Sequence, residues 1–360
     1  PLFPTWATSI AGWIGLIAVL ALYAAMLHAW YAPAIAEPDD NGYFAQGSLL
    51  AQTGQTWFTP GSDAQYIGMH WLITPDGKYI SRYPPGLPVA IAVVYKLFGW
   101  KAACLVNPGL SVLALIGLFL AVRQVLAGRL AHAPPTTGSA PALGASRSPR
   151  LGWGPANWWA VVAVALLAFN PIFVHHALAG DSHMAVVCVL TWGLFALAAW
   201  VERPRIWVAF LAGLVLGCIP TIRYADAVMG LGVLVLLLSQ WRRVGLRKIG
   251  MHWLAAFAGA LIPILPLLWR NHVLMGAFWK TGYSLTNEET GFSWLYFKEH
   301  ALDYIWQINS GGLGLVFGLG IAGIAAVMWA RGRRGLGWML ALLATPRSLV
   351  YMAYYDRQST

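Results

Sequence analysis

The stretch TSIAGWIGLIAVLALYAAMLHAWY, residues 8–31, decides the fold class of this chain. It contains no Asp, Glu, Lys or Arg, and a helix needs about 20 mostly apolar residues to cross a lipid bilayer. The run is long and lacks a small-residue cleavage site, so it predicts a membrane span rather than a signal peptide. An all-α integral membrane protein is therefore expected.

The composition of the whole chain agrees with this expectation. Apolar residues make up 59% and charged residues 10% of the 360 positions, whereas an ordinary soluble domain has about 25% charged residues. The mean hydropathy is +0.62. The 20 Trp and 14 Tyr suit the interfaces of a membrane, where amphipathic rings gather.

Further runs of the same kind predict nine spans in a single polytopic domain, 1–360. They are 8–31, 102–126, 157–178, 184–201, 206–222, 225–240, 251–269, 311–330 and 336–354. The segment 86–99 is shorter and carries Lys96, so it predicts a helix that lies on the membrane surface. The end of the chain, 356–360, is unlike a natural terminus, and a truncated C-terminus is expected.

The distribution of Lys and Arg predicts which loops lie in the cytoplasm. Thirteen of the 23 cations, with a single acid, fall in or beside four connections on the N-terminal side of the membrane. These connections are 127–156, 202–205, 241–250 and 331–335. Positive charge marks cytoplasmic loops, so the N-terminus is predicted to be cytoplasmic. The 127–156 loop is rich in Pro, Gly, Ser and Ala and is expected to be flexible.

The outward side then holds two large loops, 32–101 and 270–310, and the short turn 179–183. The formal net charge of +10 sits in membrane-flanking loops, so no nucleic-acid partner is predicted. Cysteines occur only within apolar runs, which gives neither a disulfide framework nor a metal-binding spacing.

The first outward loop begins with an acid pair, Asp39-Asp40, directly after a span. One interpretation is a capped helix start, because Asp is a favoured N-cap and stabilises the first helical turn. The other is catalysis, because transfer to a hydroxyl or amine acceptor needs a general base near the membrane surface.

The same loop contains Asp76-Gly77, which predicts the turn of a hairpin. It is followed by Arg82-Tyr83-Pro84-Pro85-Gly86, in which the prolines fix the chain at the entry to the surface helix. Arg82 and Tyr83 suit either an interfacial belt or a phosphate clamp, since Arg presents a planar fork of donors.

Three further positions are candidates for chemistry. Asp181 lies in the short outward turn, where it either caps the next span or joins the site. Arg223 ends the fifth predicted span, where it either forms a local ion pair with Asp226 or meets the phosphate of a lipid. Lys280 lies in the second large loop. A metal held by Asp181, His183 and the acids of the first loop is the weaker alternative, because the spacing matches no zinc motif. No metal site and no cofactor are predicted.

The order of these motifs resembles the lipid-dependent glycosyltransferases of the GT-C class. The matching residues, over roughly 8–270, are Asp39-Asp40-x-x-Tyr43, Gln46-Gly-Ser-Leu-Leu50, Gly54, Arg82-Tyr83-Pro84-Pro85-Gly86, Leu97-Phe98-Gly99 and Asp181. The bacterial branch with protein O-mannosyltransferases and the lipid A aminoarabinose transferase is the most similar. Such enzymes usually have more spans than this chain.

The resemblance implies a function and a set of site residues. Sugar passes from a polyprenyl-phosphate donor to a glycolipid, polysaccharide or protein acceptor, with inversion, on the outer or periplasmic face of the cytoplasmic (inner) membrane. Asp39 aligns with the decisive acid, Asp40 stands where the family often has Glu, and Asp181 aligns with the acid of the second outward turn. Arg82 and Arg223 match family cations more loosely. Apart from the resemblance, Tyr83 and Lys280 are predicted to complete the phosphate-binding set.

A transporter or flippase for a lipid-linked or anionic solute is the competing class. It would use the same cations, and it predicts charged residues in the middle of spans. Arg347 is the clearest such residue in the sequence.

Overall fold

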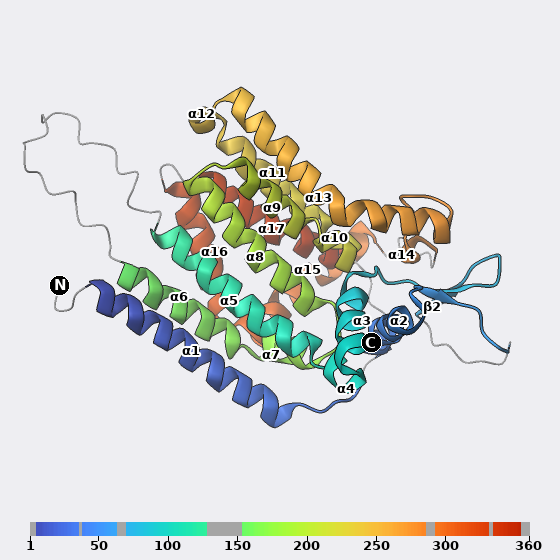
Figure 1. Cartoon of the computed structure of the whole chain (residues 1–360). Helices are drawn as coiled ribbons and strands as arrows, with labels where there is room; N and C mark the ends of the chain where they lie inside the picture. Colours follow the sequence, from blue (N-terminus) through green and yellow to red (C-terminus); the bar gives the residue numbers. More distant parts are fainter. Residues whose placement is uncertain are drawn as a thin grey trace, which may run out of the picture.

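The computed structural model describes residues 5–35, 38–62, 70–127, 153–285, 292–330 and 334–353, and these are mostly helical (Figure 1). The helices of the first half are α1 (Thr5–Trp30), α2 (Pro38–Thr53), α3 (Gly86–Phe98), α4 (Trp100–Ala103), α5 (Val106–Ala127), α6 (Trp153–Ala168), α7 (Pro171–Leu178) and α8 (His183–Glu202). The second half contains α9 (Ile206–Leu216), α10 (Ile219–Ile222), η2 (Tyr224–Met229), α11 (Gly230–Ser239), α12 (Trp241–Val244), α13 (Leu246–Met275), α14 (Gly282–Leu285), α15 (Trp294–Ile308), η4 (Asn309–Leu313), α16 (Leu315–Trp329) and α17 (Arg334–Met352).

Five helical segments of the described chain are long and apolar enough to cross a membrane, which confirms the helical membrane class. They are Ile10–Trp30, Trp100–Leu126, His183–Glu202, Tyr224–Val244 and Leu246–Met275. A sixth is formed if α6 and α7, bent by 65° at a short break, are one span. The prediction of nine spans is not confirmed, because the helices at 206–222 and 316–329 are shorter, and α17 carries Arg347.

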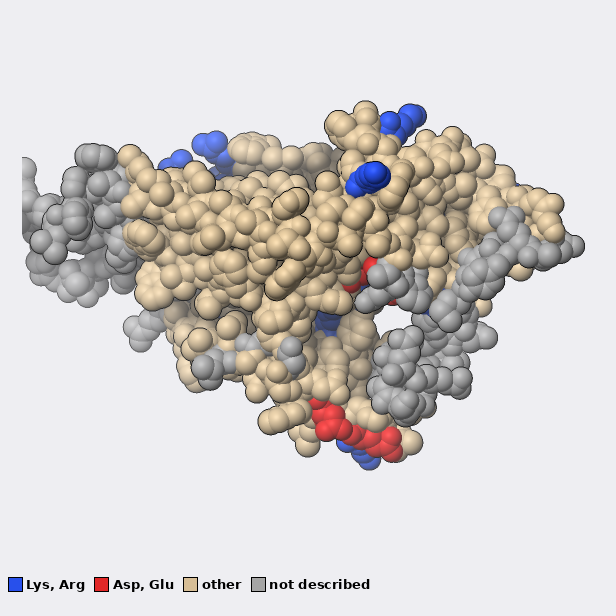
Figure 2. Space-filling view, turned by 90° about the horizontal axis from the view of Figure 1, so that it is seen from below, with Lys and Arg blue, Asp and Glu red and all other residues tan. Residues whose placement is uncertain are grey.

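The surface of the bundle is apolar, as lipid contact requires. Ile17 on α1 is 65% exposed and Phe257 on α13 is 63% exposed. Figure 2 shows a face on which charged side chains are sparse and the tan surface is continuous over most of the bundle. Exposed apolar side chains in such numbers mark a membrane or partner contact, and bilayer lipid accounts for them here.

The spatial order of the long helices differs from their order in the chain. Helix α1 packs on α6, α6 on α5, α5 on α8, α8 on α9, and α9 on α13. Glycines bring α9 and α13 close together, since a Cβ at Gly213 would lie 1.8 Å from the carbonyl oxygen of Ala256. Small residues at helix contacts are the usual means of close packing in membranes.

The 32–101 loop, which is predicted to face outward, folds into a helical and β cap at one end of the bundle (Figure 1). Helix α2 packs on α3. Three short strands, β1 (Trp57–Phe58), β2 (Trp71–Ile73) and β3 (Tyr79–Ser81), form an antiparallel sheet in the order β1-β3-β2. Trp57 pairs with Ile80, and Trp71 pairs with Ser81.

The predicted hairpin turn is confirmed between β2 and β3. Gly77 has a φ of +75°, and its N–H donates to the carbonyl of Thr74 at 2.9 Å. Helix α3 starts at Gly86 after the two prolines, as predicted. The 127–156 loop lies almost wholly outside the described residues, as do 286–291 of the second large loop.

Candidate active site

The acid pair lies in the first turn of α2, which confirms the predicted helix start. The Asp39 side chain is 55% exposed, and its Oδ1 accepts a hydrogen bond of 2.5 Å from the phenol of Tyr83. Asp40 is buried, and its Cβ faces Gly180 in the 179–183 turn. The two acids therefore differ in role, because only Asp39 presents a carboxylate to the outside.

The Tyr83 hydroxyl joins Asp39 to a buried histidine. His70 Nδ1 lies 2.7 Å from the Tyr83 oxygen and 3.9 Å from Asp39 Oδ1. A phenol has a single proton, and this one is donated to Asp39, so Nδ1 of a neutral His70 carries the proton that it donates to the phenol oxygen. Burial, together with the charge of Arg82, lowers the pKa of His70, which favours this neutral form.

Tyr83 stays neutral for two reasons. Burial raises its pKa above the ordinary value, and the hydrogen bond to the Asp39 carboxylate raises the pKa further. The phenol is thus a fixed donor that orients Asp39. Tyr83 stacks on Tyr43 of α2 at a ring distance of 4.4 Å, which ties α2 to the segment after β3.

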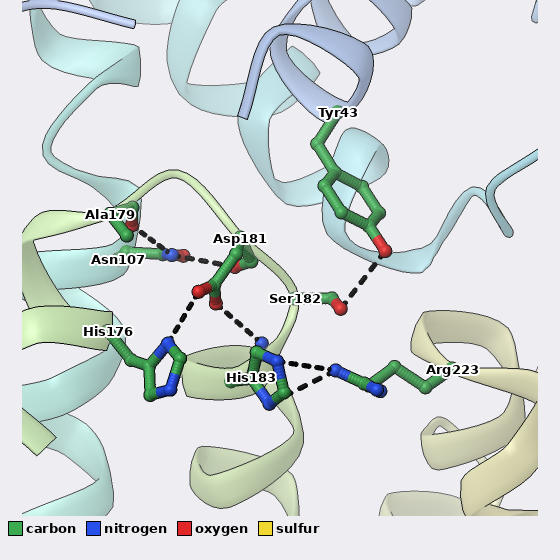
Figure 3. Close-up of polar contacts among 8 residues, drawn as sticks. All are labelled: Tyr43, Asn107, His176, Ala179, Asp181, Ser182, His183 and Arg223. Carbon is green, nitrogen blue, oxygen red and sulfur yellow. Dashed lines mark hydrogen bonds and ion pairs between the residues drawn. The ribbon is translucent and has the colours of Figure 1, made fainter. Parts of the chain in front are cut away.

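Tyr43 extends the cluster to the 179–183 turn. Its hydroxyl donates to Ser182 Oγ at 3.0 Å (Figure 3). Burial raises the pKa of Tyr43, so it too stays protonated. Tyr43 therefore stacks against Tyr83, which holds Asp39, and donates a hydrogen bond to Ser182, which follows Asp181.

Asp181 is held between two histidines in this turn (Figure 3). Its Oδ2 lies 2.5 Å from His176 Nδ1, and its Oδ1 accepts the backbone N–H of His183 at 2.8 Å. Burial opposes ionisation, but the hydrogen bond from His176 and the neighbouring imidazoles hold the pKa of Asp181 below its ordinary value. The N-cap residue of α8 is Ser182, which makes no side-chain capping hydrogen bond, and Asp181, the residue before it, binds the first N–H of α8.

Arg223 comes next in the cluster, at the end of α10. One guanidinium nitrogen lies 2.8 Å and 3.0 Å from the two ring nitrogens of His183 (Figure 3). The other side of the guanidinium faces Asp226 of η2 at 3.5 Å and donates to the hydroxyl of Tyr351 on α17. Arg347 of α17 lies 3.2 Å from the same Asp226, which is 0% exposed. Two cations thus share one buried carboxylate.

Arg82 lies over two aromatic rings. Its Cζ is 5.2 Å from the ring centroid of Tyr83 and 5.6 Å from that of Tyr283 on α14. Helix α14 comes from the second large loop, 270–310, and its Gly282 packs directly on the Arg82 backbone. The two large loops therefore meet at Arg82.

The predicted site residues are distributed as follows. Asp39, Arg82, Tyr83, Asp181 and Arg223 belong to one continuous cluster linked by the contacts above, and Asp40 borders it through Gly180. Lys280 is exposed after α13, and within the described chain it has no hydrogen bond or ion pair to a member of the cluster.

The sequence predicts no catalytic or phosphate-binding role for His70, Tyr283 or Arg347, although Arg347 stands out as a charge within a predicted span. His70 has no neighbouring motif that would mark it. Tyr283 and Arg347 are visible in the sequence as one aromatic in a loop and one charge in a span, but their proximity to Arg82 and Asp226 comes from long-range packing.

Comparison with known proteins gives no family for this chain. No family model matches it, and no curated protein matches it.

Proposed function

We propose that this protein is an inverting glycosyltransferase that moves a sugar from a polyprenyl-phosphate donor to an acceptor at the outer face of the cytoplasmic membrane. The observation that carries this proposal is the continuous cluster from Asp39 to Arg223. It has an exposed carboxylate at one end and cations at the other. A base for the acceptor and positive charge for the departing phosphate are the two needs of this reaction.

The reaction is a single displacement. The acceptor hydroxyl or amine gives its proton to Asp39, and its lone pair attacks C1 of the sugar. The bond from C1 to the phosphate oxygen breaks, and the electron pair leaves with the polyprenyl phosphate. Attack opposite the leaving group inverts the anomeric centre. Arg223 and Arg82 offset the charge that grows on the phosphate.

The environment of Asp39 supports its role as the base. The Tyr83 phenol fixes Oδ1, and in the described part of the chain Oδ2 has no hydrogen-bond or ion-pair partner. The hydrogen bond from Tyr83 to Oδ1 thus orients the carboxylate, and Oδ2 is presented to an incoming acceptor. General bases act when they are within hydrogen-bond reach of the proton that they remove.

An apolar cavity supports the choice of a lipid-linked donor. It has a volume of about 510 Å³ and lies among α8, α9, α11, α13 and α17, with Leu216, Val233 and Phe257 in its wall. Asp226, the partner of Arg223 and Arg347, also lines it. An isoprenoid chain in this cavity would have its phosphate close to the two arginines.

The transporter alternative draws on the same two arginines. Charged residues within membrane helices mark solute pathways, and Arg347 lies on α17 beside the fully buried Asp226. The two classes differ in the product, because only a transferase separates the sugar from the polyprenyl phosphate.

The first test is native mass spectrometry of the purified protein titrated with polyprenyl phosphate. Saturable one-to-one binding is expected for the wild type, and the Arg82→Ala/Arg223→Ala variant should lose it. Polyprenol without phosphate should bind more weakly, and Lys280→Ala serves as an exposed-cation control. Binding that is indifferent to both arginines contradicts the proposal.

The second test measures release of polyprenyl phosphate from a panel of lipid-linked sugars. Asp39→Asn should fold normally and lose at least about 10²-fold in rate, the range of a missing general base. Asp76→Asn, an exposed acid of the β2–β3 turn in the same loop, is the matched control and should retain the wild-type rate. Near-normal turnover in Asp39→Asn would refute the assignment.

A further inference from the structure

We propose that His176, Asp181 and His183 form a binding site for a divalent transition-metal ion, with Zn²⁺ as the best-matched ion. One ligand atom from each of the three side chains lies within 4.8 Å of the others. The proposal concerns metal binding only. The site shares Asp181 with the cluster described above and borders Arg223, but metal binding needs neither a donor lipid nor Asp39, so it can be tested without the proposed transferase activity.

The ligand chemistry is that of zinc. Imidazole nitrogen and carboxylate oxygen are both common Zn²⁺ ligands, and imidazole favours transition metals over Mg²⁺ or Ca²⁺. Two histidines and one acid are three protein ligands, the number that leaves a fourth tetrahedral position for a water or an anionic oxygen. Within the described residues no acid of the 32–101 loop belongs to this group, so the ligand set differs from the one that the sequence suggested.

The distances require a small adjustment. Bond lengths of about 2.0–2.2 Å to a tetrahedral ion place two ligand atoms roughly 3.5 Å apart. His176 Nδ1 and Asp181 Oδ2, now hydrogen-bonded at 2.5 Å, would separate by about 1 Å, and His183 would move inward. The ion would replace the proton that these two atoms share.

The backbone around the ligands is already fixed. Asn107 of α5 donates to the carbonyls of Ala179 and Asp181, at 2.6 and 2.7 Å (Figure 3). The His183 N–H holds Asp181 Oδ1, so Oδ2 is directed to His176. Outer hydrogen bonds of this kind orient ligands and raise metal affinity.

Arg223 is the group that opposes a cation here. One of its nitrogens lies 3.0 Å from Nδ1 and 2.8 Å from Nε2 of His183, so it competes with a metal ion for the one lone pair of the neutral imidazole. Its positive charge disfavours a bare dication nearby. An oxyanion between Arg223 and the metal would offset both charges, so inorganic phosphate is expected to raise the Zn²⁺ affinity.

The test is calorimetric titration of the full chain in detergent, freed of metal by a chelator. One Zn²⁺ per chain is expected, and His176→Gln and His183→Gln should each weaken binding by more than about 10-fold, the range seen even for outer-shell partners. His175→Gln is the matched control, because His175 is the exposed neighbour on α7 and is not one of the three ligands. Size-exclusion profiles check that each variant folds.

A second measurement needs no variant. Diethylpyrocarbonate acylates accessible imidazoles, and peptide mass spectrometry reports each histidine separately. Zn²⁺ should protect His176 and His183 while leaving His175 reactive. Equal acylation of all three histidines with and without Zn²⁺, or the absence of saturable one-site binding in the wild type, would overturn the metal site.

Discussion

At the residue scale, the cluster is organised by tyrosines that act as hydrogen-bond donors. Tyr83 holds Asp39, and Tyr43 links Tyr83 to Ser182. Buried phenols are costly unless they are paired, and each of these has a partner. The same contacts that stabilise the fold thus set the direction in which the Asp39 carboxylate points.

Replacement of Tyr83 by Phe removes this donor and keeps the ring. His70 Nδ1 and Asp39 Oδ1 both lose their partner, which should cost about 1–3 kcal/mol of unfolding free energy. The transfer rate should fall, and by less than in Asp39→Asn, because the base remains but is less well oriented. Thermal denaturation in detergent and the donor-cleavage assay measure the two effects. A variant with unchanged stability and rate contradicts the role given to the phenol.

The lowered pKa of His70 predicts a pH dependence of stability. The unfolded histidine titrates at its ordinary value of 6.5 and the folded one below it, with Asp39, Arg82 and Tyr83 as its charged or polar neighbours. Between the lowered pKa and pH 6.5 the folded state therefore binds fewer protons than the unfolded state. The His70 contribution to the unfolding free energy should be fully present above pH 6.5 and should decrease as the pH falls toward the lowered pKa.

Melting temperatures between pH 7.5 and about 5 measure this slope. His70→Asn should flatten it, because Asn does not titrate, whereas His300→Asn replaces an exposed histidine of α15 and should leave it unchanged. Equal slopes in the wild type and His70→Asn would exclude His70 as the origin.

At the element scale, the site depends on α14 meeting the segment that follows β3. A Cβ at Gly282 would lie 2.3 Å from both the Cα and the carbonyl oxygen of Arg82. No side chain fits at this position, so only glycine allows Tyr283 to reach the Arg82 guanidinium. The close backbone contact at Gly282 and the stacking of Tyr283 on Arg82 therefore both hold the two large loops together.

Gly282→Ala should therefore push α14 away from Arg82. The expected loss is about 1–3 kcal/mol of stability, as for other overpacked contacts, together with weaker polyprenyl-phosphate binding. Gly250→Ala on α13 is the control, because a Cβ there meets nothing within 4 Å and Ala favours the helix. Native mass spectrometry and thermal denaturation would show the difference, and equal behaviour of the two variants would contradict the argument.

At the scale of the whole molecule, the cap of α2, α3 and the small sheet lies at one end of the bundle (Figure 1). The Arg-rich connections are predicted to face the cytoplasm, which would place this cap outside. The orientation has a direct test, because the cap and the α12–α13 connection both carry exposed side chains.

Single cysteines introduced after removal of the native ones report this orientation. Asp76→Cys, in the cap, should react with a membrane-impermeant maleimide in intact cells. Arg247→Cys, at the start of α13, should react only after the membrane is permeabilised. The reverse pattern would place the cluster on the cytoplasmic side and would exclude an outward active site.

The sequence by itself determined the membrane class and the local elements. Long apolar runs have one stable solution in lipid, a helix, because every backbone group must be hydrogen-bonded within the segment. The hairpin at Asp76-Gly77, the helix whose first turn holds Asp39 and the helix that follows Pro85 rest on local backbone preferences, so short stretches predict them.

The tertiary structure alone decided which side chains meet. Asp39 reaches Tyr83 and His70 across 44 and 31 positions of the chain, and Arg347 reaches Asp226 from the last described helix. The apolar runs that form the bundle do not encode the spatial order α1, α6, α5, α8, α9, α13, because lipid-facing and packed helices are apolar all round. Helix packing at small residues such as Gly213 and Gly282 brings distant polar residues into one cluster. Because these polar residues lie far apart along the chain, no local sequence pattern predicts the cluster.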